Sequence, residues 1–131
     1  MAKKITIVKV RRSSQENINQ ELQWLGNSFG LFNLRDKDSS CFRIFITLVR
    51  KSKRNEAISS DKIADQLSLT RGTVVHHLSK LMDSGIVIRE RTGYLLRENT
   101  LQQVVRDMKR DVEQMFIEMM DVAQEIDEKL G

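Results

Sequence analysis

The sequence predicts a mostly α-helical fold with one small β-hairpin, and three features of the 131-residue chain predict it. Residues 59–84 contain two short runs of apolar residues at helical spacing, separated by a tight turn. Residues 86–96 contain two short apolar runs around a polar turn, which is typical of a β-hairpin. Residues 100–130 carry a continuous apolar stripe without proline or glycine, which predicts one long helix.

The first short helix is expected to begin at Ser60, whose hydroxyl can cap its N-terminus. Asp61 follows in the positively polarised first turn. Three apolar residues then share one face of this helix: Ile63, Ala64 and Leu67. Ser68 and Leu69 break the pattern, so the helix should end there.

The second short helix is predicted over residues 71–84, with Thr70 as its N-cap. Its apolar residues recur at steps of four and three: Val74, Leu78 and Leu81. Asp83, Ser84 and Gly85 supply a C-terminal stop signal. Two short helices joined in this way form a helix-turn-helix.

This second helix leaves one side without large apolar residues. With Val74 at the centre of the buried face, a step of about 100° per residue points the following residues away from the core: Gly72, His76, Ser79 and Lys80. Arg71, at the N-terminal end, can reach either flank. Such a face suits a helix in the major groove of DNA, although an ordinary solvated helix face has a similar composition.

The predicted hairpin follows this helix directly. Residues 86–88 form a β-branched run, residues 89–93 a polar turn that contains Arg89 and Arg91, and residues 94–96 a return strand. A basic hairpin directly after a recognition helix is a wing.

These residues resemble the winged helix-turn-helix of ArsR-type prokaryotic transcriptional regulators, with MarR-type regulators as near relatives. The resemblance covers residues 59–97 closely, and these positions carry it: Ile63, Ala64, Leu67, Leu69, Thr73, Val74, His77, Leu78, Leu81, Gly85, Ile86 and Val87. It implies a DNA-binding regulator and a structural role for His77. Ser68 stands where the wider pattern often has glycine, and Val75 and His76 stand where family members commonly have serine and arginine. The resemblance therefore does not extend to the operator sequence.

The long C-terminal helix is expected to make a dimer. Its stripe contains these residues: Leu101, Val104, Met108, Val112, Met115, Met119, Val122, Ile126 and Leu130. A helix of thirty residues is about 45 Å long, more than a domain this small can cover. An N-terminal stripe with Ile18, Leu22 and Leu25 offers a second surface, and the resemblance implies that such flanking helices form the dimer. The alternative is that both stripes pack inside one chain.

These features divide the chain into three parts: an arm and helix over residues 1–35, a winged core over 36–98, and a dimerisation helix over 99–131. The apolar segment from Cys41 to Val49 should be the first helix of the core, with Asp38 or Ser39 as its cap and a buried thiol at Cys41. Residues 4–10 are expected to form a short strand or an extended arm.

The net charge of +4 is unevenly distributed. The balance is +7 for residues 1–58, +1 for residues 59–98 and −4 for residues 99–131. The basic run Arg50, Lys51, Lys53 and Arg54 can contact phosphates, or it can keep the surface soluble and complement the end of a helix.

Several functions are not expected. The sequence has no glycine-rich phosphate loop and no histidine beside a nucleophile, which argues against an enzyme and a cofactor. Its single cysteine and its adjacent histidines, His76 and His77, are a poor metal-ligand set. Neither a transmembrane run nor a signal peptide is visible, so we expect a cytoplasmic protein.

Two hypotheses follow. In the first, the chain is a homodimeric transcription factor, most simply a repressor of unknown effector, that binds double-stranded DNA. The expected DNA-binding residues are Thr70, Arg71, Gly72, Thr73, His76, Ser79, Lys80, Arg89 and Arg91. In the second, the winged helix is a protein-interaction or assembly module, and the acidic C-terminal helix docks another protein.

Overall fold

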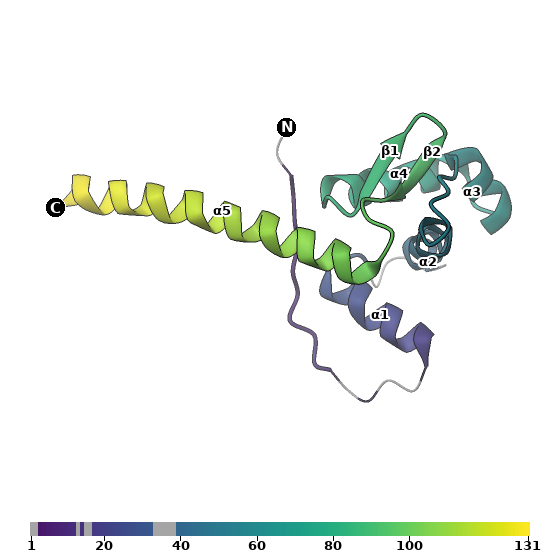
Figure 1. Ribbon diagram of the computed structural model, residues 1–131, viewed down its shortest axis with the longest axis horizontal. Coiled ribbons are helices and arrows are strands. Elements are labelled where there is room, and N and C mark those ends of the chain that lie inside the picture. Colours follow the sequence, from purple (N-terminus) through teal and green to yellow (C-terminus); the bar gives the residue numbers. More distant parts are fainter. Residues whose placement is uncertain (1–2, 13, 15–16, 33–38) are drawn as a thin grey trace.

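The structure is a computed structural model that describes residues 3–12, 14, 17–32 and 39–131. In this part of the chain it contains five helices and two strands: α1 (Ile18–Ser28), α2 (Ser40–Ser52), α3 (Ser60–Leu67), α4 (Arg71–Asp83), β1 (Val87–Glu90), β2 (Gly93–Leu96) and α5 (Leu101–Leu130). Helices α2, α3 and α4 pack together with the hairpin, α1 lies beside α2, and α5 projects away from the body (Figure 1). The predicted mostly α-helical fold with a small β-wing is confirmed.

The core of the winged domain is formed by side chains from every element around it. Ile44, Phe45 and Leu48 of α2 are fully buried. They meet fully buried residues from α3, α4 and the segment before β1: Ile63, Val74, Leu78, Leu81 and Ile86. The predicted apolar faces of the two short helices therefore both face this core, and Cys41 is buried as expected.

The helix starts follow the sequence signals closely, with one correction. Ser59, not Ser60, caps α3, because its side-chain oxygen accepts a hydrogen bond from the Lys62 amide at 3.1 Å. Thr70 caps α4 as predicted, accepting from the Thr73 amide at 3.2 Å. Ser39 occupies the cap position of α2 without a side-chain cap bond, and Asp38 lies outside the described residues.

The wing is longer in its strands and shorter in its turn than predicted. Arg89 and Glu90 belong to β1, and Gly93 opens β2, so residues 91 and 92 alone connect the two strands. Tyr94 also exchanges two backbone hydrogen bonds with Ile58, of 3.0 and 2.8 Å. Because a Cβ on Gly93 would lie 2.4 Å from the Ile58 carbonyl carbon, only glycine fits at this close approach.

Residues 4–10 form an extended arm and not a strand. The Lys4 amide donates to the Asp83 carbonyl at 3.1 Å, and the Val8 amide donates to the Ser28 carbonyl at 2.8 Å. The arm thus connects the end of α4 with the end of α1. Of the two alternatives for this segment, the arm is the one observed (Figure 1).

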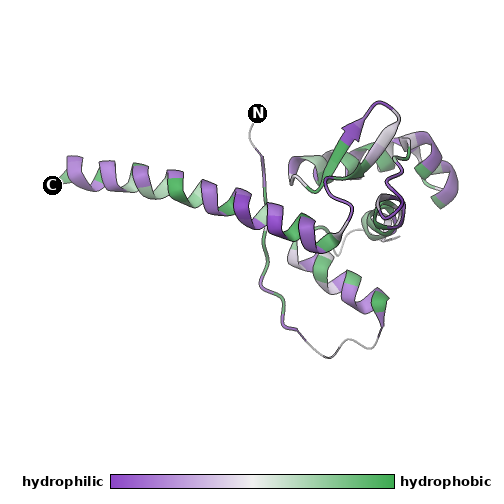
Figure 2. Cartoon of the chain, viewed as in Figure 1, coloured by the Kyte–Doolittle hydropathy of each residue, from purple (hydrophilic) through white to green (hydrophobic). Residues whose placement is uncertain are grey.

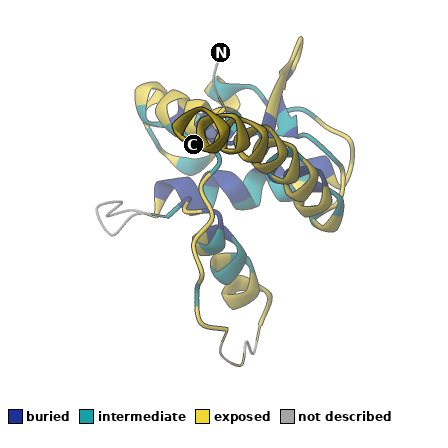
Figure 3. Cartoon of the chain, turned by 90° about the vertical axis from the view of Figure 1, so that its left-hand side faces the viewer, coloured by how far each residue is buried: buried dark blue, intermediate teal, exposed yellow. Residues whose placement is uncertain are grey.

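Helix α5 begins in the core and ends outside it. Val104 and Met108 are buried against the winged domain of their own chain, so these two positions do not face a partner, and their assignment to a dimer surface is corrected. Leu101 is partly buried against the same core. Every residue from 113 onward is exposed (Figure 3). Within the described residues, no helix is both long enough and apolar enough to span a membrane.

A cluster of charges fixes α5 to the end of the wing. The Arg97 guanidinium lies 3.4 Å from the Asp107 carboxylate and 2.7 Å from that of Asp111, and Lys3 lies 3.5 Å from Asp111. The hydrogen bond from Arg97 holds the pKa of Asp111 below its ordinary value, and burial partly opposes this effect. Because Asp107 has a side chain that is only 4% exposed, this is a partly buried network that orients the helix.

Candidate nucleic-acid interface

The candidate interface is the outer face of α4. Arg71, Gly72, His76, Ser79 and Lys80 are all exposed, as the helical spacing predicted. The opposite face is closed, because the three apolar residues at its centre have no exposed surface. This helix therefore presents a row of polar and basic groups on a rigid, well-packed support.

Two hydroxyl groups organise the N-terminal end of this face. Thr70 accepts a hydrogen bond from the Thr73 amide, and its own hydroxyl donates to Thr73 Oγ1 at 2.8 Å. Thr73 is half-buried and Thr70 is exposed. These contacts give Thr70 and Thr73 a role in shaping the start of the helix, which is where a recognition helix meets base edges.

Arg71 is held loosely beside α3. Its Nε lies 3.5 Å from a carboxylate oxygen of Asp61, and the two side chains are 74% and 75% exposed. Such an exposed ion pair contributes about 0–1 kcal/mol and is screened by salt. A phosphate group can therefore replace Asp61 as the partner of Arg71 at little cost.

The two histidines lie side by side but differ in exposure. Their ring centroids are 5.4 Å apart at an interplanar angle of 61°. His76 is exposed on the polar face, whereas His77 is half-buried toward the core. His76 can thus reach a ligand outside the helix. In the part of the chain that the structure describes, no three His, Cys, Asp or Glu side chains gather in a metal-binding group.

The wing places its arginines at the tip of the hairpin. Arg89 stands opposite Tyr94 in the strand register, and its guanidinium lies 5.7 Å from the centre of the Tyr94 ring. This cation–π contact gives the side chain a preferred direction. Arg91 lies in the connecting turn, and both arginines are exposed.

Sequence reasoning missed two apolar side chains on these surfaces. Val75 on α4 and Ile88 on β1 are each 40% exposed. Ile88 follows the buried Val87 and points to the opposite face of its strand, and Val75 follows the buried Val74 and is turned from it by about 100° around the helix. The sequence did contain a signal for them, because each apolar residue stands one position after a residue of the buried face. Exposed methyl groups of this kind can contact the thymine methyl in a major groove.

The basic run at the end of α2 lies elsewhere. Arg50, Lys53 and Arg54 line a pocket between α1 and α2, and Lys51 pairs with Glu56 at 3.4 Å. The basic residues at the end of α2 therefore line a surface that is separate from the polar face of α4.

Comparison with known proteins supports the assignment of this region. Residues 53–89 match the family model described as "Bacterial regulatory protein, arsR family". The matched segment runs from the end of α2 through α3 and α4 into β1. Comparisons with curated proteins and with solved structures gave no match. The segment from residue 53 to residue 89 is therefore similar to the helix-turn-helix of the arsR family of bacterial regulatory proteins, and this match supports a DNA-binding transcriptional regulator of an ArsR-like type.

Proposed function

We propose that the protein is a homodimeric repressor that binds a pseudo-palindromic operator, with α4 in the major groove and the wing on the backbone or in the adjacent minor groove. The observation that carries the proposal concerns α4: its polar face is exposed, and its opposite apolar face is fully buried in the core. A dimer presents two such helices, which suits two half-sites about one DNA turn apart.

The residues of α4 have different roles in this proposal. His76 and Ser79 lie within the exposed face and read base edges, whereas Arg71 and Lys80 contact phosphates. Gly72 is exposed, and a Cβ built on it would meet nothing within 4 Å. The absence of a side chain there lets the helix backbone approach the DNA closely.

The wing contributes charge at a second place. Arg89 and Arg91 are exposed at the tip of the hairpin, and an arginine side chain can bind a phosphate or enter a narrow minor groove. The backbone bridge between Ile58 and Tyr94 holds β2 against the segment that precedes α3. These contacts support affinity rather than sequence choice.

The dimer is formed by the outer part of α5. Apolar residues remain uncovered there, in a helix that alternates between apolar and charged positions (Figure 2): Met115 37%, Phe116 56%, Met119 53%, Met120 60%, Val122 54% and Ile126 50% exposed. Burying a side chain of this kind stabilises an interface by about 1.5–3 kcal/mol before the costs of association. Val112 is half-buried at the inner end of this surface.

The N-terminal part of the predicted dimer surface stays a proposal. Ile18 is 73% exposed, whereas Leu22 and Leu25 are partly buried against the core of their own chain. Helix α1 can therefore contribute Ile18 to a partner more readily than the other two residues.

The experiment that tests DNA binding is fluorescence anisotropy of mixed-sequence duplexes across a salt titration, with Arg71→Ala/Arg89→Ala beside the unchanged chain. We expect a linear fall of log affinity with log salt that is shallower in the variant. Lys109→Ala/Lys129→Ala is a matched control, because it removes two exposed positive charges from α5. A slope that changes equally in both variants would contradict binding through α4 and the wing.

A second candidate function is a protein-interaction module that docks through α5. The uncovered apolar surface of the outer α5 and the −4 balance of residues 99–131 favour it. Two results together would support this function over the first: the protein binds no duplex at low salt, and it sediments as a monomer.

A further inference from the structure

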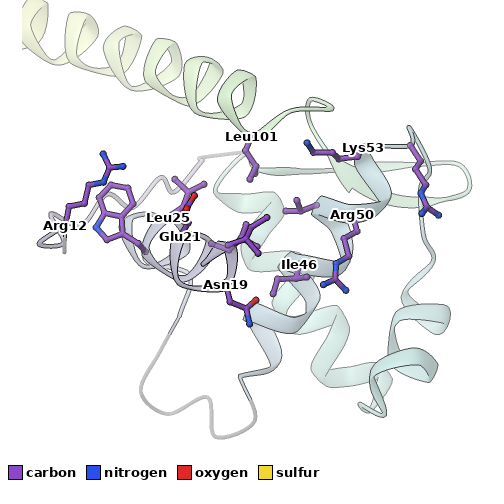
Figure 4. Close-up of a pocket in the computed structure, with 13 residues that line it drawn as sticks. Arg12, Asn19, Glu21, Leu25, Ile46, Arg50, Lys53 and Leu101 are labelled. Carbon is purple, nitrogen blue, oxygen red and sulfur yellow. The ribbon is translucent and has the colours of Figure 1, made fainter. Parts of the chain in front are cut away.

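A pocket of about 690 Å³ lies between α1, the C-terminal half of α2 and the first residue of α5 (Figure 4). Its wall is mainly apolar, with Leu22, Leu25, Ile46, Val49 and Leu101 contributing from three different helices. This volume is within the range of small-molecule sites, which is about 300–1,000 Å³. The proposed DNA-binding face does not use this pocket.

The rim of the pocket is strongly basic. Arg12, Arg50, Lys53 and Arg54 line it, against the single carboxylate of Glu21. Among the described residues, no carboxylate lies within ion-pair distance of Arg50, Lys53 or Arg54. By contrast, their neighbour Lys51, which does not line the pocket, pairs with Glu56. Within the basic run of residues 50–54, the cations without a carboxylate partner are thus the ones that line the pocket.

Trp24 adds an available hydrogen-bond donor. It lines the pocket, and the Arg12 guanidinium lies 5.7 Å from the centre of its ring. The Trp24 Nε1–H is buried and has no acceptor among the described residues. Buried indole N–H groups usually have an acceptor, so this unsatisfied donor is an unusual feature of a residue that lines the pocket.

We propose that this pocket binds a small amphipathic organic anion, which has an apolar body and a carboxylate. The body would pack against Leu22, Leu25 and Ile46. The carboxylate would lie at the rim, where Arg50 and Lys53 can bind it. A cation would be repelled by the same rim, and a neutral apolar molecule would leave the charges unused.

The outer α5 of a second copy of the chain resembles the proposed ligand in its chemistry, because it is both acidic and apolar. A helix with its side chains is about 10–12 Å wide, so a pocket of this volume cannot enclose several turns of one. The size of the pocket therefore favours a small ligand, and occupation by a second copy is an outcome that the test must exclude.

The chain offers a direct readout, because Trp24 is its only tryptophan and lines the pocket. We would follow Trp24 emission during titration with decanoate, kept below its micelle concentration, and with decanol and decylammonium as probes of equal chain length. We expect a saturable change with decanoate, binding of decanol weaker by roughly tenfold, and no binding of decylammonium. The measurement needs no DNA, so its outcome is independent of the proposed DNA binding.

Three variants locate the ligand. Arg50→Gln/Lys53→Gln should weaken decanoate roughly tenfold and leave decanol unchanged, since only the charge contacts are lost. Ile46→Phe should weaken both ligands by filling the pocket. Lys109→Gln is the matched control and should change neither, because Lys109 is an exposed lysine of α5 that does not line the pocket.

Two outcomes would overturn the proposal. One is a Trp24 emission that does not respond to decanoate, or that responds equally in Arg50→Gln/Lys53→Gln and in the unchanged chain. The other is a loss of self-association in Arg50→Gln/Lys53→Gln, measured by sedimentation without decanoate, which would identify the outer α5 of a second copy as the occupant.

Discussion

Removing the two wing arginines gives the sharpest test of how this protein binds DNA. The exposed cations on the α4 face and the wing are Arg71, Lys80, Arg89 and Arg91, four in each chain. If each neutralises one phosphate, each contributes about −0.9 to the slope of log affinity against log salt. The expected slope is then about −7 for a dimer and about −3.6 for a monomer.

The double variant Arg89→Gln/Arg91→Gln removes half of these contacts. The slope should become shallower by about 3.6 if a dimer binds and by about 1.8 if a monomer binds. The size of the change thus reports the number of chains on the DNA as well as the role of the wing. The hairpin itself should stay folded, because both side chains are exposed and the backbone pairing is unchanged.

The assay is anisotropy of a labelled duplex between about 50 and 200 mM salt, the range in which such contacts change affinity strongly. Lys109→Gln/Lys129→Gln changes the net charge by the same amount on α5 and should leave the slope within its error. A wing variant with an unchanged slope, or a control that changes as much, would refute the placement of the wing on the phosphate backbone.

Four further predictions follow from named contacts. His76→Ala should lower affinity for a selected operator by about 1–3 kcal/mol and relax one base preference, and equal losses on all duplexes in anisotropy would make it a backbone contact. Met115→Glu should dissociate the dimer in sedimentation, because it puts a charge into an apolar surface, and an unchanged oligomer would remove this position from the interface. Gly93→Ala should lower thermal stability by roughly 2–4 kcal/mol through its clash with the backbone before α3, and an unchanged melting temperature would contradict the close approach. Asp111 has a pKa lowered chiefly by Arg97, so it stabilises the fold above its unfolded pKa of about 3.9 and loses this effect as pH falls through the folded value. Asp111→Asn should therefore flatten the acid limb of the stability curve in chemical denaturation.

The local signals in the sequence were sufficient for the helix-turn-helix. Thr70, the apolar spacing of α4 and the stop at Gly85 all act within a few residues, and the structure follows them. The cap of α3 was wrong by one residue because Ser59 and Ser60 are chemically equal candidates. Only the backbone position of each serine distinguishes them, and that position depends on the bridge that Ile58 makes with Tyr94.

The turn of the wing could not be predicted from residue types alone. Arg89, Glu90 and Gly93 were predicted to lie in the polar turn, yet all three belong to strands. Gly93 is in β2 because the backbone of Ile58 packs where its side chain would be. A contact across more than thirty residues thus decides the length of this hairpin, and no local pattern records it.

The candidate site was predicted in part for the same reason. The exposed polar face of α4 follows from helical geometry, since one buried residue sets the direction of all the others. The exposed Val75 and Ile88 were missed, because only polar and basic side chains were expected to bind DNA. The pocket between α1 and α2 was also invisible, since its lining comes from segments that are far apart in the sequence, namely α1, α2 and the start of α5.

Helix α5 shows how one continuous pattern can serve two purposes. Its stripe keeps a single period along its length, yet Val104 and Met108 are in the core and Met119 and Ile126 are outside it. The Arg97 cluster fixes the inner part of the helix to the winged domain, so the outer part is a rigid extension of that domain. Under the proposed dimer, the pairing of two such extensions sets the separation of the two α4 helices. A change in the outer α5 should then alter the spacing of half-sites that the protein accepts, even though no residue there touches DNA.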